Sequence, residues 1–156
     1  MRKNTSRVLA LLIILVVGAV TWRITHPPLS PSQRIELALQ NATTSLENRS
    51  VGGVMSALSK DFAFNGTPRK EIADILRGAF FQWRDVKMQR TQTSIEVRGE
   101  SASTRGSYIL NFRPNIDATV ETQRGEYALE WRLENDEWKV VRANVKPESG
   151  AALPAF

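Results

Sequence analysis

The sequence predicts an α+β domain in which three N-terminal helices pack on a curved antiparallel sheet of about four strands, preceded by one transmembrane helix that acts as a signal anchor. Apolar residues recur at helical spacings up to Trp83, and from Val86 onward the period changes to two. Ahead of both regions, residues 8–22 form an uncharged and almost wholly apolar run. The change of period indicates helices first and sheet second, and the apolar run indicates the membrane segment.

Three helices are expected before the sheet. The first starts at Pro31, because residues 30–33 (SPSQ) form a capping box with proline at the first helical position. Ser50 is suited to cap a short second helix. Residues 65–66 (NG) predict a turn, and the third and most regular helix begins directly after it. Its apolar stripe is wide enough to face a sheet and consists of Ile72, Ile75, Leu76, Ala79, Phe80 and Trp83.

Alternating polarity predicts the strands. Between residues 102 and 112 the even-numbered residues share one largely apolar face, and residues 125–133 alternate in the same way. Residues 134–137 (ENDE) predict a hairpin turn. Residues 86–97 change phase part-way, which predicts a bulge or a bend.

The register of the last hairpin orients two polar residues. If its strands pair directly across the turn, Arg142 and Asn144 fall on the same apolar face as Trp131. An inward arginine must be paired or must reach solvent. Two interpretations of Arg142 stay open: a structural ion pair with Glu121 or Glu126, or a contact to an acidic ligand.

The composition excludes most catalytic and metal chemistry. The chain has no Cys and one His, which excludes disulfides, iron–sulfur clusters, thiolate zinc sites and cysteine nucleophiles. The single histidine, His26, lies beside two prolines in a predicted linker, so a Ser-His-Asp hydrolase is not expected. We predict no metal, no cofactor and no catalytic residue.

The net charge of +5 is concentrated near the N-terminus. Four of the 21 Lys and Arg residues lie in residues 1–26, which contain no Asp or Glu, so the remaining chain has 17 basic and 16 acidic residues. The two signs are interspersed there, which is typical of a solvated surface and not of a phosphate-binding stripe. We therefore expect no nucleic-acid partner.

The N-terminal residues predict an exported domain that stays attached to a membrane. We assign residues 1–7 as a basic cytoplasmic region, residues 8–24 as the signal anchor and residues 25–30 as a linker. The first alternative is a cleaved signal peptide, for which the sites after Gly18 or Thr21 are weak. The second is a buried core helix, which would require the nearby basic residues to be buried. By the positive-inside rule, the domain lies on the extracytoplasmic, periplasmic side of the inner membrane of a bacterium.

Two segments of the chain resemble the nuclear transport factor 2-like superfamily, which includes the polyketide-cyclase-like and ketosteroid-isomerase-like domains. They are residues 61–72 (DFAFNGTPRKEI) and residues 125–145 (GEYALEWRLENDEWKVVRANV). The resemblance covers residues 31–146 and leaves residues 147–156 as a predicted flexible tail. It implies a cone in which the concave sheet and the long helix enclose an apolar pocket. It implies no particular activity, because this fold hosts isomerases, dehydratases, cyclases, ligand binders and structural modules.

The implied pocket has several candidate lining residues. Tyr108 and Tyr127 lie on the expected inner face, where they either fill the core or donate to a substrate oxyanion. The other aromatic residues have the same two interpretations, as ordinary core or as ligand-binding walls. No carboxylate is placed to act as a base there. The full candidate set is Trp83, Tyr108, Phe112, Tyr127, Trp131, Arg142 and Asn144.

These observations predict a membrane-anchored extracytoplasmic module that acts as a non-catalytic interaction or assembly subunit of a cell-envelope complex. Its expected partners are the membrane and a protein, or a second copy bound through the sheet. The alternative is an exported protein that binds a small apolar ligand, or an isomerase-like or dehydratase-like enzyme, in the cone pocket. A cavity of at least ~300 Å³ with convergent polar groups would favour the ligand. A filled cone with an exposed apolar patch would favour the interaction subunit.

Overall fold

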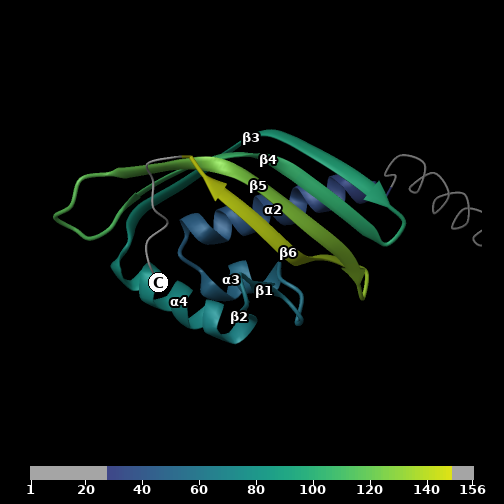
Figure 1. The fold of residues 1–156 in the computed structure, drawn as a ribbon, viewed down its shortest axis with the longest axis horizontal. Coiled ribbons are helices and arrows are strands. Elements are labelled where there is room, and N and C mark those ends of the chain that lie inside the picture. The colour runs from purple at the N-terminus through teal and green to yellow at the C-terminus, as the bar shows by residue number, and fades with distance from the viewer. Residues whose placement is uncertain (1–27, 149–156) are drawn as a thin grey trace, which may run out of the picture. The chain divides into compact units, whose positions relative to one another are not determined.

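The computed structural model describes residues 28–148, and the chain divides into two units between Ser30 and Pro31. The fold given below is that of the second unit (Figure 1). Its helices are α2 (Pro31–Glu47), α3 (Val51–Ser56) and α4 (Arg69–Gln82). Its strands are β1 (Ala63–Phe64), β2 (Thr67–Pro68), β3 (Arg84–Arg98), β4 (Ser101–Arg113), β5 (Glu121–Glu134) and β6 (Glu137–Pro147).

The main sheet is antiparallel with the strand order β3-β4-β5-β6, so each strand pairs with its neighbour in the sequence. It arches over the helices, which lie on its concave side (Figure 1). The predicted alternation in β4 is confirmed, because Ala102, Thr104, Tyr108 and Phe112 are buried whereas Arg105 is exposed. The predicted α+β arrangement of helices on an antiparallel sheet is therefore confirmed.

Helix α2, and not α4, lies along the concave face of the sheet (Figure 1). Ile35 and Leu39 are one helical turn apart on α2, and both join the core cluster that includes Trp131 and Val140. Helix α4 packs on α3 and on the β1-β2 hairpin. The sequence favours α4 for the sheet-facing position, and the structure corrects this. Both helices carry an apolar stripe, and the path of the chain decides which stripe meets the sheet.

A short hairpin precedes α4. Strands β1 and β2 form a two-stranded sheet, and its turn residues Asn65 and Gly66 have φ angles of 50° and 85°. Positive φ at both central residues defines a type I′ turn, for which Asn-Gly is the favoured pair. The predicted turn is confirmed, whereas the two flanking strands were not evident from the sequence.

A bulge in β3 changes which residues face the helices. Between the pairs made by Thr91 and Ser94, both Gln92 and Thr93 stand opposite Gly106. Gln92 has a positive φ of 54°. The extra residue moves the inner face from even-numbered residues before the bulge to odd-numbered residues after it. This is the phase change predicted for residues 86–97.

A second bulge corrects the predicted orientation of two candidate residues. The pairing of β5 with β6 shifts between Glu130 and Trp131, which leaves Val141 as an extra residue in β6. The two faces of β6 therefore exchange after Val141. Arg142 and Asn144 are exposed on the outer face, and Arg142 Nη1 lies 3.1 Å from a Glu130 carboxylate oxygen. Their predicted inward orientation is wrong.

No helix within residues 28–148 is long and apolar enough to cross a membrane. The predicted signal anchor at residues 8–24 lies outside the described residues, as does most of the predicted tail at residues 147–156.

Candidate ligand-binding cavity

A cavity of about 310 Å³ lies between α2 and the concave face of the sheet. The helices contribute Leu39, Ala42, Thr43, Leu46 and Val54 to its wall. The strands contribute Met88, Arg90, Tyr108, Leu110, Gln123, Tyr127, Leu129 and Val145. Most of these side chains are apolar, so the cavity offers water few hydrogen bonds.

The spacing of the sequence explains this apolar wall. Leu39, Ala42 and Leu46 recur at intervals of three and four residues, which places them on one face of α2. Leu110 and Leu129 occupy inward positions of neighbouring strands, where the alternation of the sheet sends charged residues outward. The helix and the sheet therefore present mostly apolar side chains to the space between them.

The Tyr108 ring belongs to the cavity wall, and its hydroxyl is the unusual polar group of the site. The residue is 6% exposed, and the hydroxyl oxygen is buried without a hydrogen-bond partner among the described residues. Burial raises the pKa of Tyr108 above the ordinary 10.0, because apolar surroundings disfavour the phenolate. The group is thus a neutral phenol whose hydrogen-bonding capacity no described residue uses.

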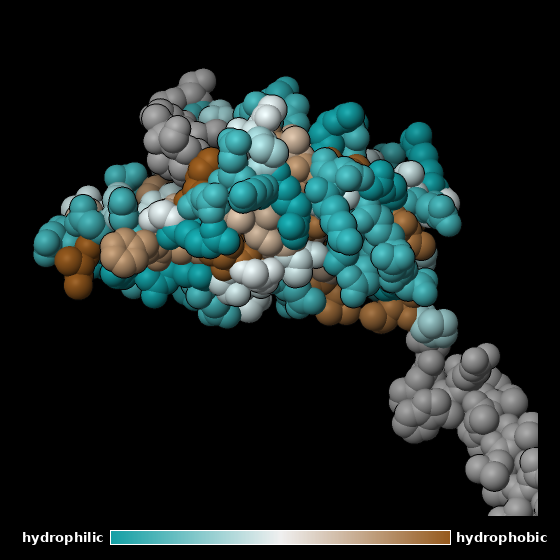
Figure 2. Space-filling model, turned by 90° about the horizontal axis from the view of Figure 1, so that it is seen from below, coloured by the Kyte–Doolittle hydropathy of each residue, from teal (hydrophilic) through white to brown (hydrophobic). Residues whose placement is uncertain are grey.

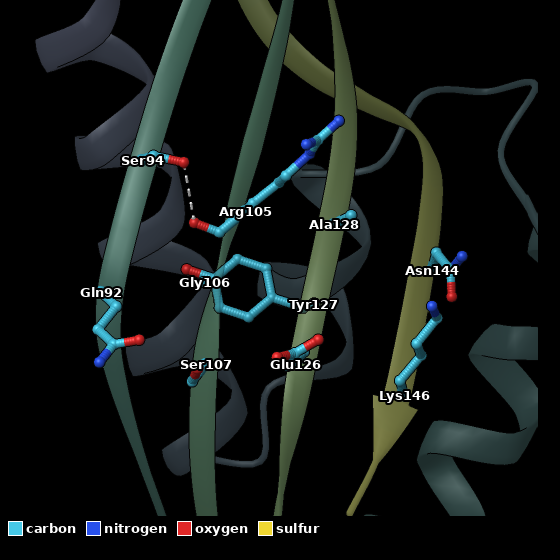
Figure 3. A pocket seen from close by; sticks show the side chains of 10 residues that line it. All are labelled: Gln92, Ser94, Arg105, Gly106, Ser107, Glu126, Tyr127, Ala128, Asn144 and Lys146. Atoms are coloured by element: carbon cyan, nitrogen blue, oxygen red, sulfur yellow. Dashed lines mark hydrogen bonds between the residues drawn. The ribbon is translucent and has the colours of Figure 1, made fainter.

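Tyr127 belongs to the same wall, but its hydroxyl is already engaged. The hydroxyl oxygen lies 2.8 Å from Thr93 Oγ1. The ring crosses Gly106 on the neighbouring strand (Figure 3). A Cβ atom on Gly106 would lie 2.8 Å from the Tyr127 hydroxyl oxygen and 3.0 Å from the Thr91 carbonyl oxygen. The absence of a side chain on Gly106 therefore allows Tyr127 to take this position.

Arg90 is the charged residue of the wall, and it is paired. Its Nη2 atom lies 2.8 Å from Glu36 Oε1 on α2. Burial alone would lower the pKa of Arg90, but the hydrogen bonds to Glu36 and Tyr127 and the charge of Glu36 outweigh it and raise the pKa. The ion pair ties α2 to β3. A ligand entering the cavity therefore meets a neutralised pair and not a free cation.

The cavity wall contains no group suited to proton abstraction. None of its residues is Asp, Glu or His, and enolising or dehydrating chemistry needs such a base within hydrogen-bond reach of the substrate. Within residues 28–148 there is also no cluster of three or more His, Asp or Glu residues that could hold a metal ion. The arrangement is suited to binding.

The structure brings two of the candidate residues to the cavity, Tyr108 and Tyr127. Trp83 and Phe112 do not belong to its wall. Their rings pack against each other with centroids 4.5 Å apart, where the end of α4 meets β4. Trp83 lies between the end of α4 and the start of β3, so this contact belongs to the packing at that junction.

Trp131 also lies outside the cavity wall. It is 2% exposed in the core cluster beside α2, and its Nε1 atom donates to Thr104 Oγ1 at 3.1 Å. Trp131 therefore fills the core, which is one of the two interpretations that its sequence position leaves open.

Sequence reasoning missed Arg90, Gln123 and the α2 side of the wall. Gln123 lies two residues before Gly125, so extending the alternation that places Tyr127 inward would have found it. Arg90 precedes the β3 bulge, and the phase change indicates that even-numbered residues before it face inward. The apolar stripe of α2 was recognisable from its helical spacing, but the sequence did not show that this stripe faces the sheet.

A second hollow, of about 480 Å³, lies on the outer face of the sheet (Figure 3). The small residues Gly106, Ser107 and Ala128 belong to its lining. The longer side chains around them are polar and of mixed charge: Gln92, Arg105, Glu126, Asn144 and Lys146. This surface lacks the apolar character of the inner cavity.

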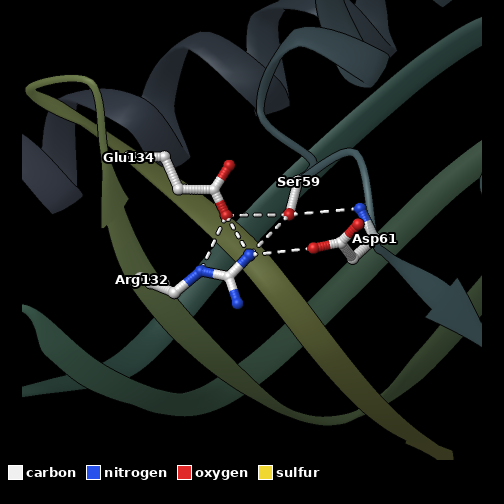
Figure 4. Close-up of polar contacts among 4 residues, drawn as sticks. All are labelled: Ser59, Asp61, Arg132 and Glu134. Carbon is white, nitrogen blue, oxygen red and sulfur yellow. Dashed lines mark hydrogen bonds and ion pairs between the residues drawn. The ribbon is translucent and has the colours of Figure 1, made fainter.

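A polar network joins the chain after α3 to the last hairpin (Figure 4). The Ser59 hydroxyl, in a residue that is 1% exposed, donates to Glu134 Oε1 at 2.8 Å. Arg132 donates to the same carboxylate through Nε at 2.9 Å and lies 3.2 Å from Asp61 Oδ2. The hydrogen bond from Ser59, followed by that from Arg132, lowers the pKa of Glu134. The groups satisfy one another, so the network serves to hold the two segments together.

A curved antiparallel sheet, a helix along its concave face and an apolar cavity between them define a cone-shaped, pocket-bearing α+β domain. The chain belongs to the SnoaL-like domain family, whose model matches residues 53–144. A search of curated proteins gave no match.

Three solved structures show the same fold. A Novosphingobium aromaticivorans protein provisionally named a scytalone dehydratase has a TM-score of 0.71 at 16% identity, covering 80% of this chain and 89% of its own. A nuclear transport factor 2-like superfamily protein from Salmonella enterica has a TM-score of 0.66 at 14% identity, covering 80% and 96%. A second N. aromaticivorans protein, provisionally named an aromatic ring hydroxylase, has a TM-score of 0.64 at 17% identity, covering 78% and 96%. The resemblance of the sequence to this superfamily is confirmed, and at these identities the likeness concerns the fold.

Proposed function

We propose that this domain binds a small, mainly apolar molecule without transforming it, in the cavity between α2 and the sheet. The observation that carries the proposal is the 310 Å³ apolar cavity, whose wall holds Tyr108, Arg90 and Gln123 as polar groups and no carboxylate or imidazole. Ligand pockets begin at roughly this size and combine apolar walls with a few polar groups. A filled cone would have favoured a purely structural module.

The cavity suggests the size and the polarity of the ligand. An engineered apolar cavity of about 150 Å³ binds benzene, so a cavity of about 310 Å³ suits a bicyclic molecule. Because Arg90 is neutralised by Glu36, an anionic group would gain little there. The buried Tyr108 hydroxyl instead favours a neutral ligand with one acceptor oxygen, such as a ketone.

Two matched probes test this proposal. 2-Acetylnaphthalene carries the acceptor oxygen, and 2-ethylnaphthalene has nearly the same shape without it. We expect both to bind, with the ketone favoured about fivefold to tenfold, the value of one hydrogen bond. The Tyr108→Phe variant is expected to bind the two probes equally.

A cavity-blocking variant completes the test. Leu129→Trp places a large ring in the cavity and is expected to abolish binding of both probes, measured by isothermal titration calorimetry. Ile109→Trp places the same ring on the outer face of β4 and is expected to leave binding unchanged. Binding that survives in Leu129→Trp, or no binding by the wild-type protein, would contradict the proposal.

The dehydratase or isomerase alternative receives less support from the site. The name scytalone dehydratase belongs to a neighbour of 16% identity. Such a reaction needs a base near the substrate, and the residues that line this cavity supply none.

We also propose that the domain is held at the outer face of a bacterial inner membrane by residues 8–24, where it takes part in an envelope complex. The uncharged run at residues 8–22 supports the attachment. Exposed apolar side chains support a protein contact: Phe81 is 81% exposed, and Ile116 and Val120 protrude from the β4-β5 connection. In Figure 2 hydrophobic colour appears at the left tip of the face, and also in its middle and at its opposite end. Full-length protein that is released from membranes by alkaline carbonate would contradict the attachment.

A further inference from the structure

A groove of about 640 Å³ lies between α3 and α4, which run side by side (Figure 1). The small or apolar residues of its lining are Val51, Gly52, Met55 and Ala73. The remaining lining residues are all charged: Lys60, Arg69, Lys70, Asp74 and Arg77. Four of these are basic and one is acidic, which gives the lining a net formal charge of +3. The groove is therefore expected to attract anions.

Folding gathers the basic residues of this groove from two segments. Lys70 and Arg77 are about two turns apart on α4, so they share one side of that helix. Lys60 belongs to the chain that follows α3 and lines the same groove. Asp61 and Glu71, their acidic neighbours in the sequence, do not belong to the lining. The two signs of charge alternate along the chain but are separated at this surface.

The four basic side chains differ in how far they are already engaged. Arg69 donates to an α3 carbonyl oxygen through Nη2 at 2.8 Å, which fixes its guanidinium at the groove. Arg77 pairs with Asp74, but both side chains are more than half exposed, so water screens this pair. Within residues 28–148, neither Lys60 nor Lys70 has a side-chain hydrogen bond or an ion pair. Their two ammonium groups are available to a ligand.

We propose that the groove between α3 and α4 binds a ligand with adjacent phosphate groups, such as a diphosphate. Guanidinium groups match the geometry of phosphate with parallel hydrogen bonds, and ammonium groups add point charges. One phosphate monoester carries about two negative charges at neutral pH. That is fewer than the net charge of +3, so a second phosphate group gains from the remaining cations. This inference is independent of the apolar cavity between α2 and the sheet.

Titration of the full chain with pyrophosphate and with orthophosphate tests the class of ligand. We expect pyrophosphate to bind about tenfold more tightly, the value of one additional charge-assisted hydrogen bond. Added salt is expected to weaken both affinities, because the groove is open to water. Isothermal titration calorimetry measures the dissociation constants. Equal affinities for the two anions, or no saturable binding of pyrophosphate, would overturn the proposal.

Two helical glycines provide matched variants that locate the site. Gly52 lines the groove, whereas Gly78 lies on α4 and does not, and a Cβ atom at either position meets no atom within 4 Å. Glutamate is a better helix former than glycine, so both variants are expected to fold. Gly52→Glu places a carboxylate among the cations and is expected to weaken pyrophosphate binding about tenfold. Gly78→Glu adds the same charge elsewhere and is expected to change the affinity by less than about twofold. Equal losses in the two variants would overturn the assignment to the groove.

Neutralising lysines tests the same site without adding a carboxylate. Lys60→Gln combined with Lys70→Gln is expected to weaken pyrophosphate binding about tenfold. Lys87→Gln combined with Lys146→Gln removes the same charge from the sheet and is expected to bind like the wild-type protein. All four lysines are exposed, so thermal unfolding is expected to be unchanged in both double variants. An undiminished affinity in the first double variant would contradict the proposal.

Competition identifies the source of the phosphate groups. If phosphatidylglycerol vesicles displace pyrophosphate from the full chain and phosphatidylcholine vesicles do not, the groove binds adjacent head groups of anionic lipids. If neither kind of vesicle displaces it, the ligand is a soluble diphosphate. A glutamate oligopeptide that binds the groove more tightly than pyrophosphate would overturn the phosphate assignment in favour of an acidic protein partner.

Discussion

The space between α2 and the sheet has a packed end and an open end. At the packed end, Trp131, Trp138 and Val140 fill the space against Ile35 of α2. At the open end the wall is built mostly from aliphatic side chains, with two tyrosines and Arg90, and about 310 Å³ stays empty. Leu39 belongs to both ends and marks the boundary between them. The same helix and the same strands therefore produce a core at one end and a binding cavity at the other.

Side-chain volume, and not polarity, makes the difference between the two ends. Both are lined by inward positions of strands and by one face of a helix. Protein cores are normally packed to crystal-like density. The side chains that line an empty cavity of this size therefore lack dispersion contacts on one side. A bound ligand would restore those contacts, which is why an empty apolar end is informative about function.

The largest expected effect comes from truncation at the packed end. Trp131→Ala is expected to destabilise the domain by about 3–5 kcal/mol, because it opens a cavity in a filled region. Leu110→Ala at the open end is expected to cost about 2 kcal/mol, because part of its surface already faces empty space. Urea unfolding measures both values. Equal losses would show that the two ends are packed alike.

Replacing one alanine by leucine at each end tests the same difference in packing. Ala42→Leu fills part of the cavity and is expected to stabilise the domain by about 0.5–1 kcal/mol while weakening probe binding. Ala102→Leu, in the core cluster at the packed end, is expected to destabilise it by about 1–3 kcal/mol through overpacking. Thermal unfolding of the two variants is a direct measurement. Destabilisation by Ala42→Leu would argue that the cavity closes in solution.

The inward faces of β4 and β5 could be predicted from the sequence more completely than those of β6. The uninterrupted alternation of β4 and β5 places Tyr108, Tyr127 and Trp131 inward, and the structure agrees. A single extra residue in β6 reverses the side on which Arg142 lies. The neighbouring residues of Val141 carry no signal for a bulge, since its geometry depends on how the end of the sheet twists over the helices.

The cavity itself was not predictable from local pattern. An apolar pocket was implied by resemblance, but its wall depends on which helix meets the sheet. The stripe of α4 is the more regular one, yet α2 takes the position, and α4 packs on α3 and on the β1-β2 hairpin instead. A cavity is the volume that remains when all side chains are placed, so no single residue predicts it.

The unpartnered hydroxyl of Tyr108 provides the next prediction. Tyr108→Phe removes a buried polar group without a partner and is expected to stabilise the ligand-free domain by about 1 kcal/mol. Thr104→Val removes the acceptor of the Trp131 indole at the packed end and is expected to destabilise by about 1 kcal/mol. Changes of opposite sign in the free energy of unfolding, measured with a chemical denaturant at neutral pH, would support the comparison. The same sign for both would contradict it.

Alkaline pH tests the same hydroxyl. The pKa of Tyr108 is raised in the folded state, so above the ordinary value of 10.0 the unfolded chain loses this proton more readily than the folded one. Stability that depends on Tyr108 is therefore complete below pH 10 and falls as the pH rises toward the folded pKa. Unfolding measured between about pH 9 and 11 should show a shallower decline for Tyr108→Phe than for the wild-type protein. Identical slopes would place this hydroxyl in contact with water.

The smallest effect is expected at the surface network that closes the packed end. The pKa of Glu134 is lowered by the hydrogen bonds from Ser59 and Arg132, so the unfolded chain binds this proton first as the pH falls. The stabilisation is present above the ordinary value of 4.5 and is lost as the pH drops through the folded pKa. Glu134→Gln should flatten the loss of stability below pH 4.5, whereas Glu126→Gln, which lies outside the network on the outer face, should retain it. Because Arg132 and Asp61 are solvent-exposed, added salt is expected to weaken this effect. If the loss of stability at acid pH is the same in Glu134→Gln as in the wild-type protein, another carboxylate causes it.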